Sequence, residues 1–253
     1  MLKHITIEGV RNLAHTQVAL PPGATVLFGA NGSGKTSFLE AIHLLAVGRS
    51  FRTHQSKPVI QHGVAHCRVV GEVQRGRRSI VMGLEKHRDG NVKARVAGEN
   101  VPSLSELALH LPLVLLDTAG LGIVTGPPEG RRRLLDGTLF HVEQGFLSQW
   151  KRYALAVRQR NRGLRRGILD SDKAWRHEIA ETGTLLTQQR QALVEKLADE
   201  LARLVPALSD DLVGLEVMFR AGWDQKLSLA EALERNADSD TAQGFTQVGP
   251  HRA

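Results

Sequence analysis

The stretch FGANGSGKTS, residues 28–37, decides how the first part of this chain folds. The pattern G-x-x-x-x-G-K-[ST] is matched in register by Gly29, Ala30, Asn31, Gly32, Ser33, Gly34, Lys35 and Thr36. The apolar run Thr25–Phe28 before it predicts a strand, and residues 35–47 after it predict a helix. A strand, a glycine-rich loop and a helix in this order are the context that the pattern requires.

A loop of this kind is an anion site. Glycines let the backbone turn tightly and direct successive N–H groups inward, and the helix that follows adds the positive end of its dipole. Lys35 is expected to reach the β and γ phosphates of a nucleotide, and the hydroxyl of Thr36 to ligate Mg²⁺. The loop therefore predicts a site for a nucleoside triphosphate and its magnesium ion.

Charge is concentrated in one part of the 253-residue chain, whose formal net charge is +7. Residues 151–166 contain seven basic side chains and no acidic one, whereas residues 167–253 contain nine basic and fifteen acidic ones. Ordinary exposed helices mix signs for i,i+4 pairing, so a one-sign run favours a phosphate-rich partner such as duplex DNA. The five arginines expected to contact DNA here are Arg158, Arg160, Arg162, Arg165 and Arg166, and the alternative is a basic helix face that is simply solvated.

Cysteine usage and hydropathy indicate a soluble, cytoplasmic protein. Cys67 is the single cysteine, which excludes a disulfide framework and fits a reducing compartment. No apolar stretch approaches the length that crosses a bilayer, and the N-terminus MLKHITIEGV has no signal-peptide pattern. No membrane partner is expected.

The patterning predicts an α/β nucleotide-binding lobe with an antiparallel meander, followed by a mainly helical lobe. Strands are expected at residues 2–8, 16–20, 68–73, 79–84 and 92–96, with Arg75-Gly76 and Asp89-Gly90 as turns. We expect three parts: residues 1–125 as the ATP-binding lobe, 126–208 as the helical lobe and 209–253 as a return to the first lobe. In that last part, alternating Leu215, Val217 and Phe219 predict a strand.

Apolar stripes predict how the helical lobe packs. Phe146, Trp150, Tyr153 and Val157 recur at helical spacing, and so do Leu193, Leu197, Leu201 and Leu204, before Pro206 ends the run. Arg131–Arg133 lie in the first turn of a helix, where the dipole disfavours cations, so we expect an anionic partner such as Glu129, Asp136 or a phosphate.

Two other functions remain open from the residues alone. Leu113–Leu116 reads as an apolar strand, and Asp117-Thr118-Ala119-Gly120 spells the DxxG of a GTPase switch. The sequence contains no Asn-Lys-x-Asp element to recognise guanine, and the long meander before Asp117 exceeds what a simple switch needs. The third possibility is a DNA-binding module that does not depend on nucleotide.

Several separate blocks carry a resemblance to a known family. They are ITIEGVRNL, LFGANGSGKTSFLEAIHLLAVGRSFRT, GPPEGRRRLLDGTLFHVEQGFLSQWKRY, VRQRNRGLR and LERNADSDTAQGFTQVGPHRA. In this order they resemble the RecF family of the SMC/Rad50/RecF group of ATPase heads, over the entire chain. Sustained heptads of a coiled-coil arm are missing, as expected for RecF rather than its longer relatives. Thr118 and Ala119 depart from the proline and acidic residue usual in the family.

The resemblance implies a function and further site residues. It implies an ATP- and DNA-binding protein of recombinational gap repair and replication-fork maintenance, which binds duplex DNA near single/double-strand junctions with RecO and RecR as partners. Arg11 and Asn12 are implied to lie near the nucleotide, Arg49 and Arg52 to face DNA or a partner head, and His251-Arg252 to match the family's GPHR block.

The resemblance also implies that the family continues beyond GPHR, with the signature motif and the Walker B carboxylates. ATP held between two heads drives dimerisation in the full-length family, which is a slow ATPase. We therefore expect the chain to be a fragment or truncated product that neither turns over Mg-ATP nor forms the homodimer by itself.

Overall fold

The computed structural model describes residues 1–53, 55–117 and 120–253, which form two compact units, Met1–Leu115 and Leu116–Ala253. The boundary lies ten residues before the expected one at residue 125. The tail 209–253 belongs to the second unit, whereas the sequence suggested that it returns to the first lobe.

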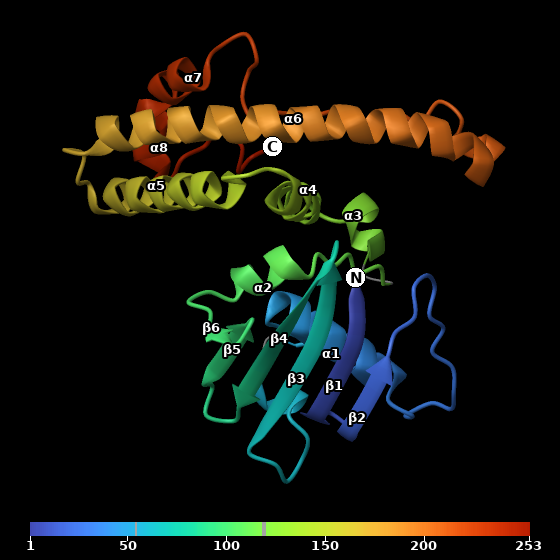
Figure 1. Cartoon of the computed structure of the whole chain (residues 1–253). Helices are drawn as coiled ribbons and strands as arrows, with labels where there is room; N and C mark the ends of the chain where they lie inside the picture. Colours follow the sequence, from blue (N-terminus) through green and yellow to red (C-terminus); the bar gives the residue numbers. More distant parts are fainter. Residues whose placement is uncertain (54, 118–119) are drawn as a thin grey trace. The chain divides into compact units, whose positions relative to one another are not determined.

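The first unit is built on one antiparallel sheet (Figure 1). Its strands are β1 (Leu2–Val10), β2 (Leu13–Ala19), β3 (His66–Arg75), β4 (Arg78–His87), β5 (Val92–Val96) and β6 (Glu99–Asn100), in the order β2-β1-β3-β4-β5-β6. Each neighbouring pair is antiparallel. The expected N-terminal strands and the meander are confirmed. The expected turns are also present: Gly76 lies in the β3–β4 turn with a left-handed φ of 62°, and Gly90 lies in the next turn with a φ of 94°.

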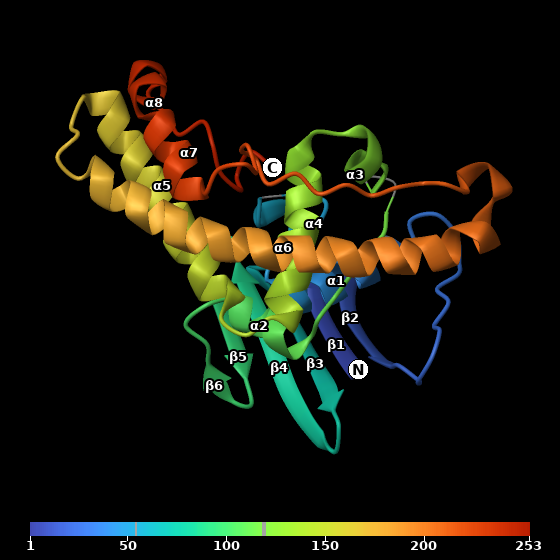
Figure 2. The same ribbon diagram turned by 90° about the horizontal axis from the view of Figure 1, so that it is seen from above.

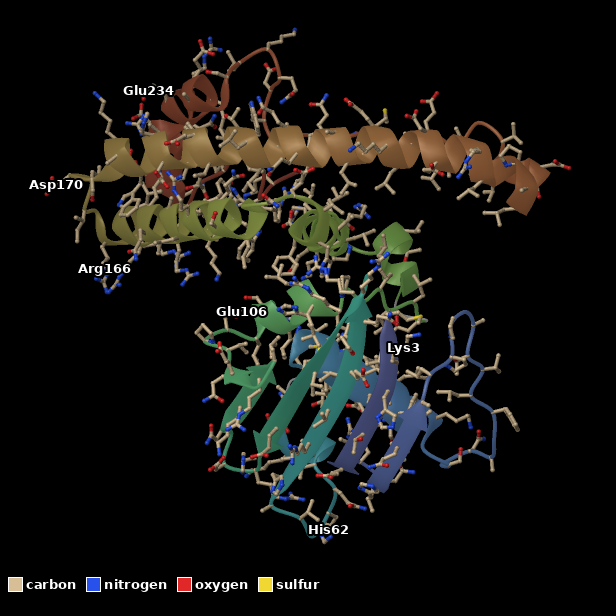
Figure 3. All side chains as sticks on the ribbon, viewed as in Figure 1. Lys3, His62, Glu106, Arg166, Asp170 and Glu234 are labelled. Atoms are coloured by element: carbon tan, nitrogen blue, oxygen red, sulfur yellow. The ribbon has the colours of Figure 1, made fainter. Side chains whose placement is uncertain are left out.

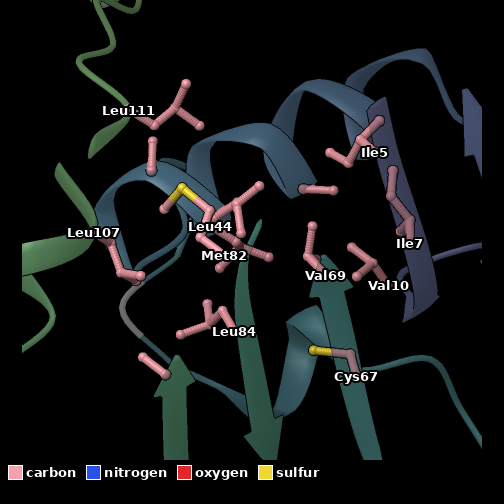
Figure 4. Close-up of a cluster of buried hydrophobic side chains, with 14 of the residues drawn as sticks. Ile5, Ile7, Val10, Leu44, Cys67, Val69, Met82, Leu84, Leu107 and Leu111 are labelled. Carbon is pink, nitrogen blue, oxygen red and sulfur yellow. The ribbon is translucent and has the colours of Figure 1, made fainter. Parts of the chain in front are cut away.

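One face of this sheet is covered by helix α1 (Lys35–Val47), the helix expected after the phosphate loop. Figure 4 shows Ile5 and Ile7 of β1, Val69 of β3 and Met82 of β4 facing Leu44 of the helix. All of these side chains are buried, each contributing about 1.5–3 kcal/mol relative to exposure. Helix α2 (Ser105–His110) adds Leu107 to the same core.

Three runs predicted as strands are not strands. Thr25–Phe28, Leu113–Leu116 and Leu215–Phe219 have no sheet partner within the described ranges. Most of their apolar side chains are exposed, for example Phe28 at 91% and Leu116 at 85%, while Leu113 and Phe219 are half-buried. An apolar run has strand propensity, but a strand needs a neighbour to accept and donate its ladder hydrogen bonds.

The second unit is mainly helical, as expected. Its helices are α3 (Leu121–Thr125), α4 (Pro128–Val142), α5 (Phe146–Arg166), α6 (Asp172–Leu208), α7 (Leu229–Arg235) and α8 (Ala237–Gln243), with 3-10 turns at Lys57–Val59 in the first unit and Asp210–Leu212 in this one. Helix α5 runs beside the first half of α6, and α7 and α8 pack against this pair (Figures 1 and 2).

The predicted apolar face of α5 forms the core of this unit. Phe146 and Tyr153 are buried with Ile179 and Leu186 of α6, while Trp150 at the rim is 39% exposed. The leucine stripe on the second half of α6 does not form a core: Leu197 is 38% and Leu204 49% exposed, because α5 does not extend that far along α6 (Figure 1). Pro206 lies in the last turn of α6, close to where the helix was expected to end.

Across the described ranges, every helix is too short or too polar to cross a bilayer.

Candidate nucleotide-binding site

The phosphate loop takes a conformation that depends on its glycines. Gly34 caps α1 with a left-handed φ of 101°, and Gly29 and Gly32 have φ values of 144° and 82°. A Cβ atom added to Gly34 would lie 2.7 Å from Cδ2 of Leu13, so a side chain there would also clash with the β1–β2 hairpin. The loop thus combines a backbone that side chains disfavour with close packing against its neighbour.

The two charged or polar side chains expected to handle phosphate stand at the start of α1. Nζ of Lys35 donates to the carbonyl oxygens of Gly29 and Ala30, both at 2.8 Å, so its charge sits over the loop. The side chain of Thr36 is exposed. The first N–H groups of a helix have no partner within the helix, and they carry a partial positive charge of about half a unit. The ammonium group of Lys35, the hydroxyl of Thr36 and the N-terminal end of α1 therefore lie together at the phosphate loop.

Asn12 joins the hairpin to the loop. Arg11 and Asn12 make the turn between β1 and β2. Nδ2 of Asn12 donates to the carbonyl of Gly32 at 2.8 Å, and Oδ1 accepts from the hydroxyl of Ser37 at 2.7 Å. Both ends of the amide are used, so the side chain spans from the phosphate loop to the first turn of α1.

Arg11 is held just as firmly. Its Nε and Nη2 atoms donate to the carboxylate of Glu40 at 2.9 and 2.8 Å, and Nη1 donates to the carbonyl of Pro58 at 2.6 Å. Its φ is 54°, a left-handed backbone that costs a non-glycine residue roughly 1–2 kcal/mol. Glycine would relieve that strain but would give up all three hydrogen bonds of the guanidinium.

These groups surround a cavity of about 820 Å³, within the usual range of ligand pockets. Its lining comprises Arg11, Asn12, Asn31, Gly32, Gly34, Lys35, Thr36, Ser37, Arg52, Lys57, Pro58, Ile60, His62 and Arg88. As far as the chain is described, the lining holds five Lys or Arg side chains and no carboxylate. Its electrostatic character suits a polyanion with a bound divalent cation.

Lys57, His62 and Arg88 are cavity residues that the sequence did not reveal, because no motif surrounds them. The backbone brings the segment of Lys57 and His62 to the site, since the N–H of Arg11 donates to the carbonyl of Val59 at 2.8 Å, whereas Arg88 comes from the turn after β4. Arg88 then braces the following loop, with Nε and Nη2 both 2.7 Å from the carbonyls of Val64 and Gln61. His62 lies in that loop, before β3 (Figure 3).

Arg49 and Arg52, implied to face DNA or a partner head, follow α1. Both are exposed. Nη1 of Arg52 lies 3.6 Å from Glu40, and Arg52 also lines the cavity. Burial alone would raise the pKa of Glu40, but hydrogen bonds from Arg11 and Ser50 and the charges of both arginines lower it below its ordinary value.

The basic run of α5 splits into two groups. Arg158, Arg162, Arg165 and Arg166 are exposed, and Arg166 projects away from α6 in Figure 3. Arg160 is buried, with Nε 2.8 Å from Asp172 and Nη1 2.5 Å from Asp240. Its assignment as a DNA contact is therefore corrected.

The physical reason is helical periodicity. Arg160 falls on the same face as Tyr153, Ala156 and Leu164, which are all buried. That spacing was readable from the sequence. The expected lack of acidic partners was also wrong for this run, because α6 and α8 supply them: Arg152 pairs with Glu178 of α6 at 2.8 Å, for example.

The arginines at the start of α4 mostly meet protein groups. Arg133 pairs with Glu129, one of the expected partners. Arg131 donates to the carbonyls of Ile123 and Gly126 at 2.9 and 3.1 Å, and Arg132 to that of Ala253 at 2.5 Å. The carboxylate of Asp136 instead accepts hydrogen bonds from Nε and Nη2 of Arg190 of α6, at 2.8 and 2.9 Å.

The GPHR block is a structural corner of the second unit. Nε2 of His251 donates to the carbonyl of Thr246 at 3.1 Å, so in the neutral ring Nδ1 accepts from the hydroxyl of Tyr153 at 2.5 Å. Burial lowers the pKa of His251 to about 4. Arg252 stacks over Phe245, 5.0 Å from the ring centroid.

The DxxG tetrapeptide is only partly described. Thr118 and Ala119 lie outside the described residues. The carboxylate of Asp117 accepts from the N–H of Gly120 at 3.1 Å, a local turn.

The phosphate loop braced by Asn12, the antiparallel sheet and the helical unit place this chain in a class of proteins that share one N-terminal domain. Residues 1–208 match the RecF/RecN/SMC N terminal domain. A similar fold occurs in a Pyrococcus furiosus Smc head domain, at a TM-score of 0.54 and 16% identity over 83% of this chain and 65% of that one.

The particular family is narrower. The chain is 40% identical over 255 residues to the DNA replication and repair protein RecF of Stutzerimonas stutzeri, and 41% identical over 257 residues to that of Pseudomonas putida strain KT2440. Each match covers 100% of this chain and 69% of the relative. A solved structure of the recombination mediator protein RecF-ATPrS in the RecFOR pathway matches with a TM-score of 0.86 and 25% identity, over 100% of this chain and 71% of that one. The chain belongs to the RecF family.

Proposed function

We propose that this chain binds Mg-ATP in the cavity of its first unit. One observation carries the proposal: Lys35, Thr36 and the Asn12-braced phosphate loop face a single cation-lined cavity of nucleotide size. Lys35 would contact the β and γ phosphates, loop N–H groups would bind phosphate oxygens, and Thr36 would ligate Mg²⁺. A bound nucleotide supplies the phosphates, and the chain's part is to hold and orient them.

We further propose that the chain acts on DNA in recombinational gap repair and replication-fork maintenance, with RecO and RecR as partners. The RecF-ATPrS structure is described as a recombination mediator of the RecFOR pathway, and it matches this chain throughout. Duplex DNA near single/double-strand junctions is the proposed substrate. The cations proposed to contact phosphates, all of them exposed, are Arg49, Arg52, Arg158, Arg162, Arg165 and Arg166. Head dimerisation with ATP is proposed for chains of the relatives' full length.

The nucleotide proposal is tested by titrating Mg-ATP and Mg-GTP in competition. Direct binding of Mg-ATP is expected, with no preference for GTP, because the chain has no guanine-reading Asn-Lys-x-Asp element. Lys35→Ala should weaken binding about a hundredfold or more, since the phosphates no longer meet the ammonium charge. A hundredfold preference for GTP would instead support the DxxG switch, and absent Mg-ATP binding would end the proposal.

Hydrolysis is not expected of the 253-residue polypeptide. Phosphoryl transfer to water needs a carboxylate beside the metal, and the cavity lining, over the described residues, contains none. A steady-state phosphate-release assay should match a no-protein blank. If the chain does hydrolyse ATP and Asp117→Asn abolishes that hydrolysis, Asp117 is the catalytic carboxylate and this expectation is wrong.

A further inference from the structure

Glu40 is a buried charge in the helix that follows the phosphate loop. It stands on α1, its side chain has 0% exposure, and it does not line the cavity. The carboxylate accepts from Arg11 at 2.9 and 2.8 Å and from the hydroxyl of Ser50 at 2.5 Å, and Arg52 lies 3.6 Å away. Burying a carboxylate is unfavourable unless its oxygens are satisfied, and here they are.

These hydrogen bonds connect Glu40 to separate stretches of the cavity wall. Arg11 links it to the turn of the β1–β2 hairpin and, through the carbonyl of Pro58, to the segment that carries Lys57 and Ile60. The hydroxyl of Ser50 also accepts from the N–H groups of Arg52 and Thr53 at 2.9 and 3.2 Å, which fixes the turn of the loop after α1. One carboxylate therefore organises residues on both sides of the site.

Arg11 supplies an independent sign of function. It keeps a left-handed φ of 54° at a position where glycine would be unstrained. Strained residues persist where the surrounding structure over-determines them, and they cluster at ligand sites. The strain holds the guanidinium against Glu40 and beside the cavity.

We propose that Glu40 is a positioning residue of the nucleotide site: it holds Arg11 and Arg52 at the cavity wall and so sets the affinity for the nucleotide polyphosphate. The inference rests on the proposed Mg-ATP site.

The sign of one substitution separates this role from simple electrostatics. A carboxylate near an anion site repels the anion, so Glu40→Gln would tighten binding if only its charge mattered. If Glu40 acts by positioning, Glu40→Gln loosens the arginines and weakens binding. Glutamine keeps the size and one acceptor oxygen, but its NH2 group cannot accept from Arg11 or Ser50, so the cavity wall loses the charged anchor and at least one of these hydrogen bonds.

The experiment is a titration of Mg-ATP into wild type, Glu40→Gln and the matched control Glu99→Gln, an exposed residue of β6 outside the cavity lining. Thermal unfolding checks that each variant is folded. We expect the Kd of Glu40→Gln to rise about fivefold or more, the scale of one ordinary hydrogen bond, and Glu99→Gln to match wild type. Equal or tighter binding by folded Glu40→Gln overturns the inference.

A mutant cycle on the Kd for Mg-ATP distinguishes positioning from a merely structural role of Glu40. In a background of Arg11→Gln and Arg52→Gln, Glu40→Gln should change the Kd less than about twofold, because its effect passes through those side chains. A full fivefold effect in that background would contradict positioning.

If Glu40→Gln does not fold, Ser50→Ala decides, because it removes only the hydroxyl that ties Glu40 to the Arg52 turn. Weaker Mg-ATP binding by folded Ser50→Ala supports the inference, and wild-type affinity overturns it. Wild type that fails to bind Mg-ATP would refute the proposed function itself, which is a distinguishable outcome.

Discussion

Arginine side chains have different roles in the two units of this chain. In the first unit, Arg11 and Arg52 share one buried carboxylate, Glu40, and both line an open cavity. In the second, buried Arg160 lies between Asp172 and Asp240. The cationic side chains that line the cavity outnumber their carboxylate partners, whereas the buried arginine between the helices is neutralised by two aspartates. The balance of partners, rather than the number of arginines in a stretch, separates a binding site from a structural one.

Arg160→Ala should produce the largest effect on stability. It leaves Asp240, fully buried at 0% exposure, without its cation, and breaking a buried ion pair in this way costs about 3–5 kcal/mol. Urea unfolding measures the loss. Arg158→Ala, an exposed change on the same helix, is the control and should stay within about 0.5 kcal/mol. A loss for Arg160→Ala as small as the control's would remove the structural role assigned to it.

His251 predicts a dependence of stability on pH. Its pKa is about 4 in the folded protein and about 6.5 when unfolded, so the unfolded state binds more protons between these values. The free energy of unfolding should therefore be highest above pH 6.5 and fall by up to about 3 kcal/mol as the pH drops to about 4. Glu40, whose pKa is lowered, has the same sign but acts in more acidic solution, below its ordinary value of 4.5.

The measurement compares urea unfolding at pH 7.5 and 5 for wild type and His251→Gln. The variant should show a smaller difference between the two conditions, because the residue that must stay neutral against Tyr153 is gone. An unchanged difference would mean that His251 is protonated in the folded corner.

The smallest effect is expected from the exposed arginines of α5. Replacing Arg158, Arg162, Arg165 and Arg166 with glutamine should weaken duplex DNA binding for all sequences alike. It should also flatten the salt dependence of binding, by about 0.9 log units of slope for each phosphate that is no longer neutralised. Exposed Lys196 and Arg203 of α6 are the control pair. If the salt dependence is unchanged in the variant with all four substitutions, these arginines are solvated and do not contact DNA.

Local patterns predicted local structure well. The phosphate loop and α1, the β1–β2 hairpin and the meander depend on glycines, turn residues and alternation within short windows, which are readable from the sequence. Thr25–Phe28, Leu113–Leu116 and Leu215–Phe219 were not predictable in the same way, because an apolar run shows strand propensity but not whether a neighbour pairs with it.

The candidate site shows the same limit. Lys35 and Thr36 follow from a motif, and Arg11 and Asn12 from family resemblance. Lys57 and His62 reach the cavity because backbone hydrogen bonds join Arg11 to Val59 and Gln61 to Gly9. Arg88 comes from the turn after β4 and contacts the same loop through its side chain, and no local pattern encodes either pairing. Arg160 shares its helical face with Tyr153 and Leu164, a spacing visible in the sequence, whereas the composition of the run says nothing about the face that each arginine occupies.

Hydrogen–deuterium exchange with and without Mg-ATP tests the central claim most directly. If the first unit holds the nucleotide, protection should appear in peptides covering residues 9–13, 29–37 and 57–62, which carry the loop, its hairpin brace and the opposite wall. Lys35→Ala should abolish that protection. Protection confined to residues 128–253, or protection that survives in Lys35→Ala, would contradict the assignment of the nucleotide to this cavity.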